Sequence, residues 1–332
     1  MRVLEHASTL DLPDQRVAVC GDWHGNVGWA HTIARVLPYM APDVTTLLHL
    51  GDWWMPPTEI DDVFAATDID RILVTLGNHE PWNQISPLLD ERPGHAIRVS
   101  KLIWLLPRPA RLTIGGRRVL SLGGAASVDR QSRIEGSTWW PEEGVTDDHV
   151  AAAIAGGPAD LMLTHEGPAG TPVRPVREIL RTNPHRFPET ALEASAASRA
   201  RITEVWNAVR PELLAHGHMH VAAGGKTDDG RRVASLGREG HEGNLGILDM
   251  ATLKMATPSL AVIRGMSERA DIDRDWRIRN VAESLHDGTL DGRKPSTHAL
   301  RDAQDYVDGR RTLDELIEDV RRRHTRDPEG KP

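Results

Sequence analysis

The 332-residue chain has little cysteine, little Phe or Tyr, no long apolar run and no excess of positive charge. Its one cysteine, Cys20, excludes an internal disulfide, and its place in an apolar run predicts a small buried side chain. No stretch is long enough to span a membrane, and the opening residues MRVLEHASTL lack the apolar core of a secretion signal. We therefore expect no membrane partner and a reducing, cytoplasmic location.

The charge balance is acidic, with a formal net charge of -8. A general surface for duplex nucleic acid needs a basic field, so we expect none here, although local positive clefts stay open. The apolar content of 39% suffices for a core. The length predicts one large domain with a small appendage.

Tryptophan is the abundant aromatic residue, with 10 copies against two Phe and two Tyr. Four of them stand next to polar motifs: Trp23, Trp53, Trp54 and Trp82. Two interpretations remain open. These side chains wall off a pocket, or one of them stacks on a nucleobase.

Short apolar runs that end in Gly or polar residues recur along the chain and predict strands. Between them, residues 27–37 and 194–209 have helical spacing, with Asn26 as the N-cap of the first helix. Gly115 and Gly116 separate two runs and predict a hairpin. This alternation predicts a layered α/β fold with a mixed sheet. Residues 167–188, rich in Pro and Arg, are expected to form a long surface loop or a cap.

Past about residue 264 the sequence turns highly charged and predicts a small helical module. The first expected helix spans 271–286 and stops at Gly288, and the second spans 299–307 and stops at Gly309. Thr312 and Glu315 form a capping-box pattern that opens a third. The apolar stripe of the first helix is Trp276, Ile278, Val281 and Leu285.

Polar side chains follow the predicted strands. The candidates are Asp22 with His24, Asp52, Asn78 with His79, His165, and His218 with His220. The carboxyl ends of strands in α/β folds converge on one crevice. Carboxylate and amide oxygens together with imidazoles suit hard-to-borderline divalent metals. Each residue alone has an ordinary alternative, since a single His after a strand is more often hydrogen-bonded than a ligand. The set predicts a metal site.

The ordered blocks GDWH, GD, GNHE, TH and GHMH resemble the calcineurin-like metallophosphoesterase superfamily over residues 17–250. The resemblance implies a four-layer αββα sandwich with mixed sheets. We therefore predict a metallophosphoesterase domain at 1–264 and a helical tail at 265–332. A degenerate relative without metal is the alternative.

The resemblance also implies roles. Asp22, His24 and His220 would bind one divalent ion, Asn78, His165 and His218 a second, and Asp52 both. Mn²⁺ is expected, with Fe, Zn, Ni or Co as alternatives. A hydroxide held between the ions would attack phosphorus in line. His79 would face the leaving-group oxygen as proton donor or charge stabiliser, and Glu80 would orient its ring. His49 and His216 are expected to be structural.

The second block, Gly51-Asp52, narrows the range of expected substrate classes. Gly51-Asp52 lacks the second Asp and the Arg of the GDxVDRG block of protein Ser/Thr phosphatases, and the acidic balance disfavours a nuclease. The stretch LGGAASVDRQSRIEGSTWWPEE with GNHEPW resembles small phosphodiesterase-like metallophosphatases of actinobacteria and their phages. This implies a small phosphodiester substrate, such as a cyclic or short nucleotide, with a phosphomonoester as the alternative.

Three residues are candidate substrate contacts: Arg130, Arg133 and Trp82. The two arginines could reach a phosphate as planar donors. Equally, they could pair with Glu135, Glu142 or Glu143 on the rim.

The tail GRKPSTHALRDAQDYVDGRRTLDELIEDVRRRH resembles helical antitoxin domains of the VbhA type, which can block Fic-type AMP-transferring toxins. These domains inhibit through a helical motif, Ser/Thr-x-x-x-Glu-Gly/Asn. The only match in the tail, at 325–330, contains Pro328, which is unsuited to a helix. The tail is therefore either a protein-partner module of antitoxin type or a module for packing and self-association.

Overall fold

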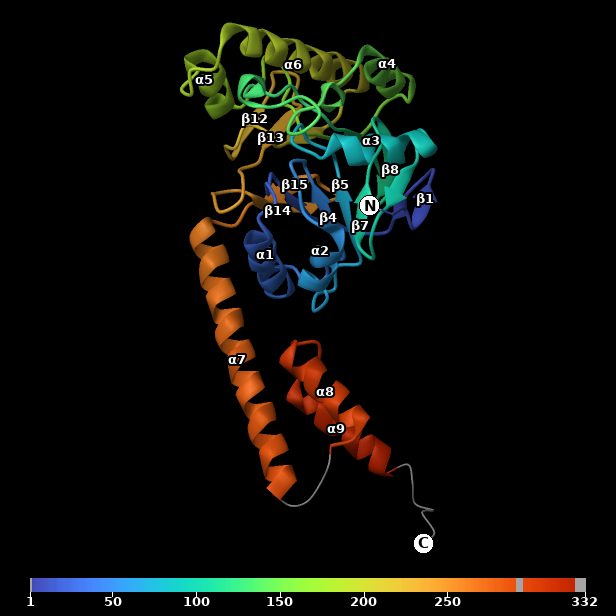
Figure 1. The fold of residues 1–332 in the computed structure, drawn as a ribbon, viewed down its shortest axis with the longest axis vertical. Coiled ribbons are helices and arrows are strands. Elements are labelled where there is room, and N and C mark those ends of the chain that lie inside the picture. The colour runs from blue at the N-terminus through green and yellow to red at the C-terminus, as the bar shows by residue number, and fades with distance from the viewer. Residues whose placement is uncertain (1, 291–294, 326–332) are drawn as a thin grey trace.

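The computed structural model describes residues 2–290 and 295–325 and shows a two-sheet body with a helical tail (Figure 1). One sheet has the strand order β1-β6-β7-β5-β4-β3-β14-β15, and the other has β12-β13-β11-β10-β9-β8-β2. Both sheets mix parallel and antiparallel pairs, so the predicted α/β class with mixed sheets is confirmed.

The strands of the first sheet are β1 (Glu5–Ala7), β3 (Arg16–Cys20), β4 (Thr46–His49), β5 (Arg71–Val74), β6 (Ala96–Arg98), β7 (Ile103–Leu105), β14 (Leu245–Asp249) and β15 (Lys254–Ala256). Those of the second are β2 (Asp11–Leu12), β8 (Ala110–Ile114), β9 (Arg117–Leu122), β10 (Leu161–Thr164), β11 (Leu213–His216), β12 (Ala223–Lys226) and β13 (Arg232–Ser235). The predicted hairpin is the β8–β9 pair.

The helices are α1 (Val27–Met40), α2 (Pro57–Val63), α3 (Trp82–Glu91), α4 (Asp147–Ala155), α5 (Arg174–Thr182), α6 (Glu189–Val209), α7 (Leu260–Leu290), α8 (Thr297–Val307) and α9 (Leu313–Thr325), with short 3₁₀ turns at Arg130–Ser132 and Pro141–Glu143. Asn26 caps α1 as predicted, since its side chain accepts a hydrogen bond from the Trp29 N–H. The capping box of Thr312 and Glu315 at α9 is also present.

Side chains that point alternately to the two faces of each strand hold the layers together. In β3, Ala18 and Cys20 pack into the core that includes α1, α2 and α3, whereas Val17 and Val19 pack into the core between the sheets. Side chains that alternate across a strand can fill two cores at once. The outer face of the second sheet packs on α4, α5 and α6. The four layers are thus helices, sheet, sheet and helices (Figure 1).

Two predictions of secondary structure are corrected. Residues 167–188 are not all loop, because α5 forms within them and buries Val176 in the outer core. Its apolar residues Val176, Ile179 and Leu180 share one face, and Val176 and Leu180 pack on the outer core. Helix α7 begins at Leu260 instead of residue 271 and continues through Gly288.

Helix α7 rests on α1 through side chains that the predicted stripe did not contain. Ile263 and Ala270 are buried there, and Arg35 of α1 pairs with Asp271 at 2.8 Å. Trp276 and Ile278 of the predicted stripe are instead exposed. The proposed division at 264/265 falls in the first turns of this helix and stays a prediction. None of the helices described is long and apolar enough to cross a lipid bilayer.

Candidate metal centre

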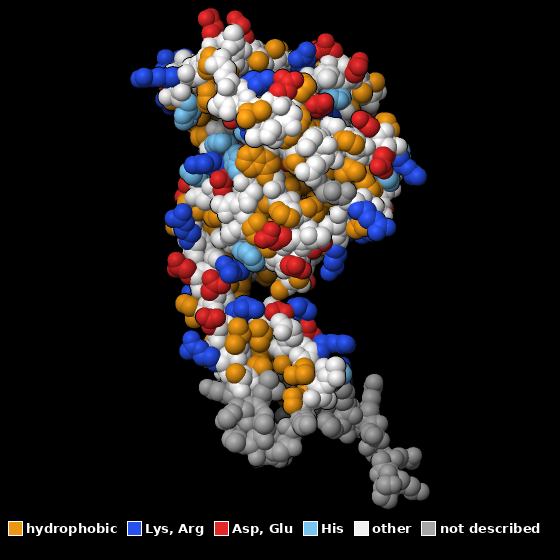
Figure 2. Space-filling view, viewed as in Figure 1, with side chains coloured by type: hydrophobic (Ala, Val, Ile, Leu, Met, Phe, Trp, Pro, Cys, Tyr) orange, Lys and Arg blue, Asp and Glu red, His pale blue; other side chains and the backbone are white. Residues whose placement is uncertain are grey.

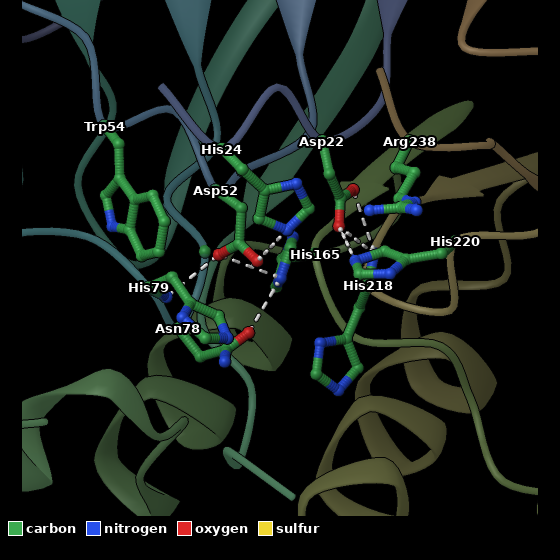
Figure 3. Close-up of polar contacts among 12 residues, drawn as sticks. Asp22, His24, Asp52, Trp54, Asn78, His79, His165, His218, His220 and Arg238 are labelled. Atoms are coloured by element: carbon green, nitrogen blue, oxygen red, sulfur yellow. Dashed lines mark hydrogen bonds and ion pairs between the residues drawn. The ribbon is translucent and has the colours of Figure 1, made fainter. Parts of the chain in front are cut away.

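The candidate ligands meet between the carboxyl ends of strands from both sheets (Figure 3). Asp22 and His24 follow β3, Asp52 follows β4 and Asn78 follows β5, all in the first sheet. The remaining candidates follow the second sheet: His165 comes after β10, and His218 and His220 come after β11. Backbone hydrogen bonds from Trp23 N (3.2 Å) and His24 N (2.8 Å) to the Asp52 carbonyl lock the first two loops together.

Four of these residues form a compact group. Ligand atoms of Asp22, His24, Asp52 and His220 all lie within 4.8 Å of one another. His220 Nε2 is 3.1 Å from Asp22 Oδ2, and His24 Nε2 is 3.4 Å from Asp52 Oδ2. Oxygen and nitrogen donors at this spacing suit a borderline divalent ion.

The second proposed ligand set is only partly assembled. His165 Nε2 lies 2.9 Å from Asn78 Oδ1 and 3.3 Å from Asp52 Oδ1, while His165 Nδ1 donates to the Leu50 carbonyl at 2.6 Å. His218 Nε2 lies 3.9 Å from Glu166 Oε2. Its ring centroid is 5.0 Å from that of His165. Asp52 therefore faces His24 with one oxygen and His165 with the other.

The backbone at the centre is strained. Positive φ angles occur at His24 (42°), Asp52 (53°), His218 (64°) and His220 (54°). Left-handed backbone is uncommon for residues other than Gly and persists where the surroundings enforce it. Four candidate ligands in this conformation indicate a functional site.

Neighbouring glycines leave room for the carboxylates. A Cβ on Gly77 would clash with the Asp52 carboxylate, and a Cβ on Gly217 would clash with the Asp22 carboxylate. Gly51 is at φ 99°, and a Cβ there would clash with His165 Nδ1. Only glycine permits this close approach. The motif glycines thus bring the ligand-bearing loops together.

The charges also fit a cation. Burial alone would raise the pKa of Asp52, but positive His165 and its hydrogen bond, together with His24, lower it well below the usual range. The pKa of Asp22 is also lowered, because the hydrogen bond from His220 and the charge of His165 outweigh burial. Both carboxylates are buried, so they need positive charge nearby.

The imidazoles complement them. Burial opposes protonation of His24, but Asp52 and Glu239 raise its pKa to about 9. Asp52 likewise outweighs burial and raises the pKa of His165 to about 10. These two rings hold protons where a metal would otherwise balance the carboxylates, and metal binding must displace them. The donor set therefore fits divalent ions.

His79 lies at the edge of the centre, beside an arginine. Its Nε2 is 3.3 Å from Arg133 Nη2 and 3.9 Å from Asp129 Oδ2. Arg133 Nε also pairs with Asp129 at 3.1 Å. A guanidinium can only donate, so His79 Nε2 accepts in this arrangement. The backbone N–H of His79 donates to Asp52 Oδ1 at 2.9 Å.

The expected role of Glu80 is corrected. Its carboxylate accepts hydrogen bonds from the backbone N–H groups of Gly77 and Trp53, each at 3.0 Å, and of Trp54 at 3.4 Å. It therefore braces two loops instead of orienting the His79 ring. Burial raises its pKa to about 7.

Two expected substrate contacts are also corrected. Trp82 is 1% exposed and lies in the core under the guanidinium of Arg108. Arg130 pairs with Glu135 at 3.0 Å and stacks on Trp139, which is the alternative left open by the sequence. Among the three candidates, Arg133 alone lies against the centre.

Sequence reasoning missed the residues that support the ligands. Glu239 Oε2 accepts from His24 Nδ1 at 2.8 Å, which leaves Nε2 for a metal. Asn244 donates to the Asp22 and Gly237 carbonyls and accepts from the Nε1 atoms of Trp23 and Trp29. Both residues follow β13, far along the chain from their partners, and no local pattern marks them.

A third support lies on the other side of the centre. Asn78 Nδ2 donates to Ser127 Oγ at 2.9 Å, and this hydroxyl donates to Glu143 Oε2 at 2.7 Å. The contact fixes the Asn78 amide with its oxygen toward His165. Its residues belong to the segment that sequence reasoning singled out for the two arginines.

The family assignment rests on residues 15–222, which match the model described as calcineurin-like phosphoesterase. The match covers more than half of the chain, so the chain belongs to this family and is a metal-dependent phosphoester hydrolase. The family typically binds two divalent metals. A separate match, described as antitoxin VbhA, covers residues 277–323. The resemblances to the calcineurin-like superfamily and to the VbhA-type antitoxin domains are thereby confirmed.

Several solved structures are similar over most of the chain. The protein TT1561 of Thermus thermophilus is 11% identical, with 74% of this chain and 99% of that chain covered and a TM-score of 0.45. A 5'-nucleotidase from Candida albicans is 13% identical, with 79% of this chain and 55% of that chain covered and a TM-score of 0.42.

A phosphopantetheinyl hydrolase from Mycobacterium tuberculosis is 14% identical, with 68% of this chain and 91% of that chain covered and a TM-score of 0.41. At these scores the similarities carry no argument about substrate. No curated protein sequence matches the chain significantly.

Proposed function

We propose that the chain is a phosphodiesterase that uses two divalent ions to hydrolyse small phosphodiesters such as cyclic or short nucleotides. The observation that carries the proposal is the placement of Asp52. Its Oδ2 is 3.4 Å from His24 Nε2, and its Oδ1 is 3.3 Å from His165 Nε2. A carboxylate so placed can bridge two ions, one on each side.

The ligand assignment is part of the proposal. Asp22, His24 and His220 would hold one ion, Asn78, His165 and His218 the other, and Asp52 both. When bound, the ions would polarise the phosphoryl oxygens and activate the attacking water. Mn²⁺ is the expected ion, with Fe, Zn, Ni or Co as alternatives for a mixed oxygen and nitrogen set.

The side chains around this centre would do the remaining work. Arg133 can donate to a phosphoryl oxygen once a substrate separates it from His79. His79 would then face the leaving oxygen as proton donor or charge stabiliser. Asn78 would keep its oxygen toward the centre through Ser127.

The preference for diesters follows from the surroundings. The acidic chain offers a dianionic monoester little extra attraction, whereas a diester carries a single negative charge. The test is kcat/KM on matched diester and monoester pairs, with Mn²⁺ and the alternative ions. Faster hydrolysis of diesters is expected. A clear preference for monoesters would establish a phosphomonoesterase, and no hydrolysis with any ion would contradict the proposal.

A second function concerns the tail. The VbhA match and the exposed apolar side chains of the tail favour a protein partner or a second copy of the chain. Among these side chains are Ile272, Trp276, Leu300, Leu313 and Ile317. Sedimentation of the full chain detects self-association. Co-purification with a Fic-type protein would support the antitoxin role, whereas a monomer that captures none would favour simple packing.

A further inference from the structure

Trp54 is an exposed residue between the buried residues Trp53 and Met55, and it lies beside the metal centre. Its side chain is 42% exposed, against 4% each for Trp53 and Met55. Its ring centroid lies 5.1 Å from that of His79 and 5.9 Å from that of His24. Figure 3 shows it on the side of Asp52 and His79, away from His220 and Arg238. The indole ring therefore stands next to two residues of the proposed centre.

The segment holds Trp54 in this position at a conformational cost. Trp54 has φ 53°, which is a rare conformation for a bulky residue. Glu80 binds the backbone N–H groups of Trp53 and Trp54, and Trp53 Nε1 donates to the Met55 carbonyl at 3.1 Å. Strain that the surroundings enforce at a site points to a function for the strained residue.

A pocket opens beside this ring. It has a volume of about 400 Å³, and its lining includes Trp53, Trp54, Met55, Pro56, Pro57 and Ile85. Figure 2 shows histidine side chains directly beside hydrophobic ones on this face of the body. The volume lies within the range of small-molecule pockets, and Gln84 and Glu80 add an amide and a carboxylate to the lining. Such a pocket suits a planar group with one polar edge.

The neighbourhood of His79 decides which part of a substrate reaches the pocket. Under the proposed function, water adds to phosphorus, the bond from phosphorus to the leaving oxygen breaks, and that oxygen takes a proton. His79 faces the leaving oxygen in that proposal, and Trp54 is the aromatic ring packed against His79. The arm on the leaving oxygen is therefore the part next to Trp54.

We propose that the Trp54 pocket binds the leaving arm of the substrate and that this arm is planar, either an aryl group or a nucleoside whose base stacks on the indole. The inference rests on the proposed phosphodiesterase function. Stacking of a base on an aromatic side chain contributes about 1–3 kcal/mol, which corresponds to about 5- to 150-fold in binding.

The kinetic test uses the Mn²⁺-loaded full chain and two substrates, bis(4-nitrophenyl) phosphate and methyl 4-nitrophenyl phosphate. Both have the same aryl leaving arm, and only the second arm differs. Trp54→Ala should lower kcat/KM by about 10- to 100-fold on both, while Trp54→Phe should recover most of the loss. Trp54→Leu keeps apolar area without a ring and should resemble the alanine variant.

Controls separate stacking from damage. Trp276→Ala removes another exposed tryptophan, on α7, and should leave both rates unchanged. Metal content and melting temperature of each variant report folding. Unchanged rates in Trp54→Ala overturn the proposal, and a loss confined to the bis-aryl substrate overturns the assignment to the leaving arm.

A binding measurement keeps the test independent of turnover. Calorimetry of adenosine 5'-monophosphate with the metal-loaded protein should show about 10- to 100-fold weaker binding for Trp54→Ala than for the unaltered chain. Equal binding overturns the pocket. Hydrolysis of neither ester by the unaltered chain contradicts the proposed function instead, and the calorimetry still decides the pocket.

Discussion

The two-sheet body and the helical tail place their side chains in opposite ways. In the body, the ionisable residues Asp22 and Asp52 are buried, whereas in the tail the apolar residues Ile272 and Trp276 are 68% and 59% exposed. Figure 2 shows hydrophobic side chains gathered on the helices below the body. Burying charge is costly unless cations compensate it, and exposing apolar area is costly unless something covers it. The body is thus suited to binding a cation, and the tail is suited to contact with the surface of a partner.

The backbone shows the same difference. Positive φ angles at non-glycine residues occur at His24, Asp52, His218 and His220 of the centre, whereas the described part of the tail has such an angle only at a glycine, Gly309. Because strain persists where many contacts enforce it, it belongs to the packed body. The contrast predicts that chemistry depends on the body alone.

The largest effect is expected for Asp52→Asn. This change removes the charge that faces both halves of the centre, so both ions should be lost and kcat/KM should fall by about 10³-fold or more. Elemental analysis and turnover measure the two effects. Full occupancy by both ions in the variant would show that Asp52 is not the shared ligand.

His79→Ala should keep the metals and lose about 10²-fold in kcat, as expected when a general acid is removed. The loss should be smaller for a 4-nitrophenolate leaving group than for an alkoxide, because nitrophenolate needs less help from a proton. His31→Ala, an exposed histidine on α1, is the control. Equal losses with both leaving groups would argue against proton donation.

Glu239→Gln should weaken the binding of one metal ion by about 10- to 100-fold. This is the usual effect of removing a carboxylate that hydrogen-bonds a ligating histidine. The reason is its 2.8 Å contact with His24 Nδ1. Glu242→Gln on the same loop, where Glu242 instead accepts from the Leu260 N–H, is the matched control. Metal titration by calorimetry measures both, and unchanged affinity would exclude this support for His24.

The smallest effect is expected for removal of residues 277–332, which match the antitoxin model or follow it. This cut keeps Ile263 and the Arg35–Asp271 pair, so α7 should stay on α1. The kcat on a small diester should be nearly unchanged, while the oligomeric state can change. If the shortened chain stays folded with both metals but loses turnover, the tail completes the site. The prediction that chemistry depends on the body alone is then wrong.

Much of the centre could be predicted because its ligands are marked locally. Each candidate stands at the end of an apolar run, and parallel strands bring such ends to one edge. The layered fold followed from the same alternation. Strand ends are short-range features, so the sequence alone identifies them.

The failures have a different cause. Trp82 and Trp54 both stand beside a motif, yet Trp82 is 1% and Trp54 42% exposed, because packing of α3 into the core buries the first and a strained turn exposes the second. Helix α5 was not predicted because its apolar residues Val176, Ile179 and Leu180 are few and stand among Pro and Arg, although they share one face and Val176 is buried in the outer core.

By itself, the sequence determined the order of the strands along the chain, the metal-binding residue types at their ends, the glycines between them and the helical character of the tail. Only the tertiary structure decided that Glu239 stands behind His24, that Arg133 meets His79 and that Glu80 braces the backbone of Trp53. The physical reason is distance along the chain. Local spacing records contacts between residues a few positions apart, whereas these supports come from segments up to 215 residues apart that only sheet packing brings together.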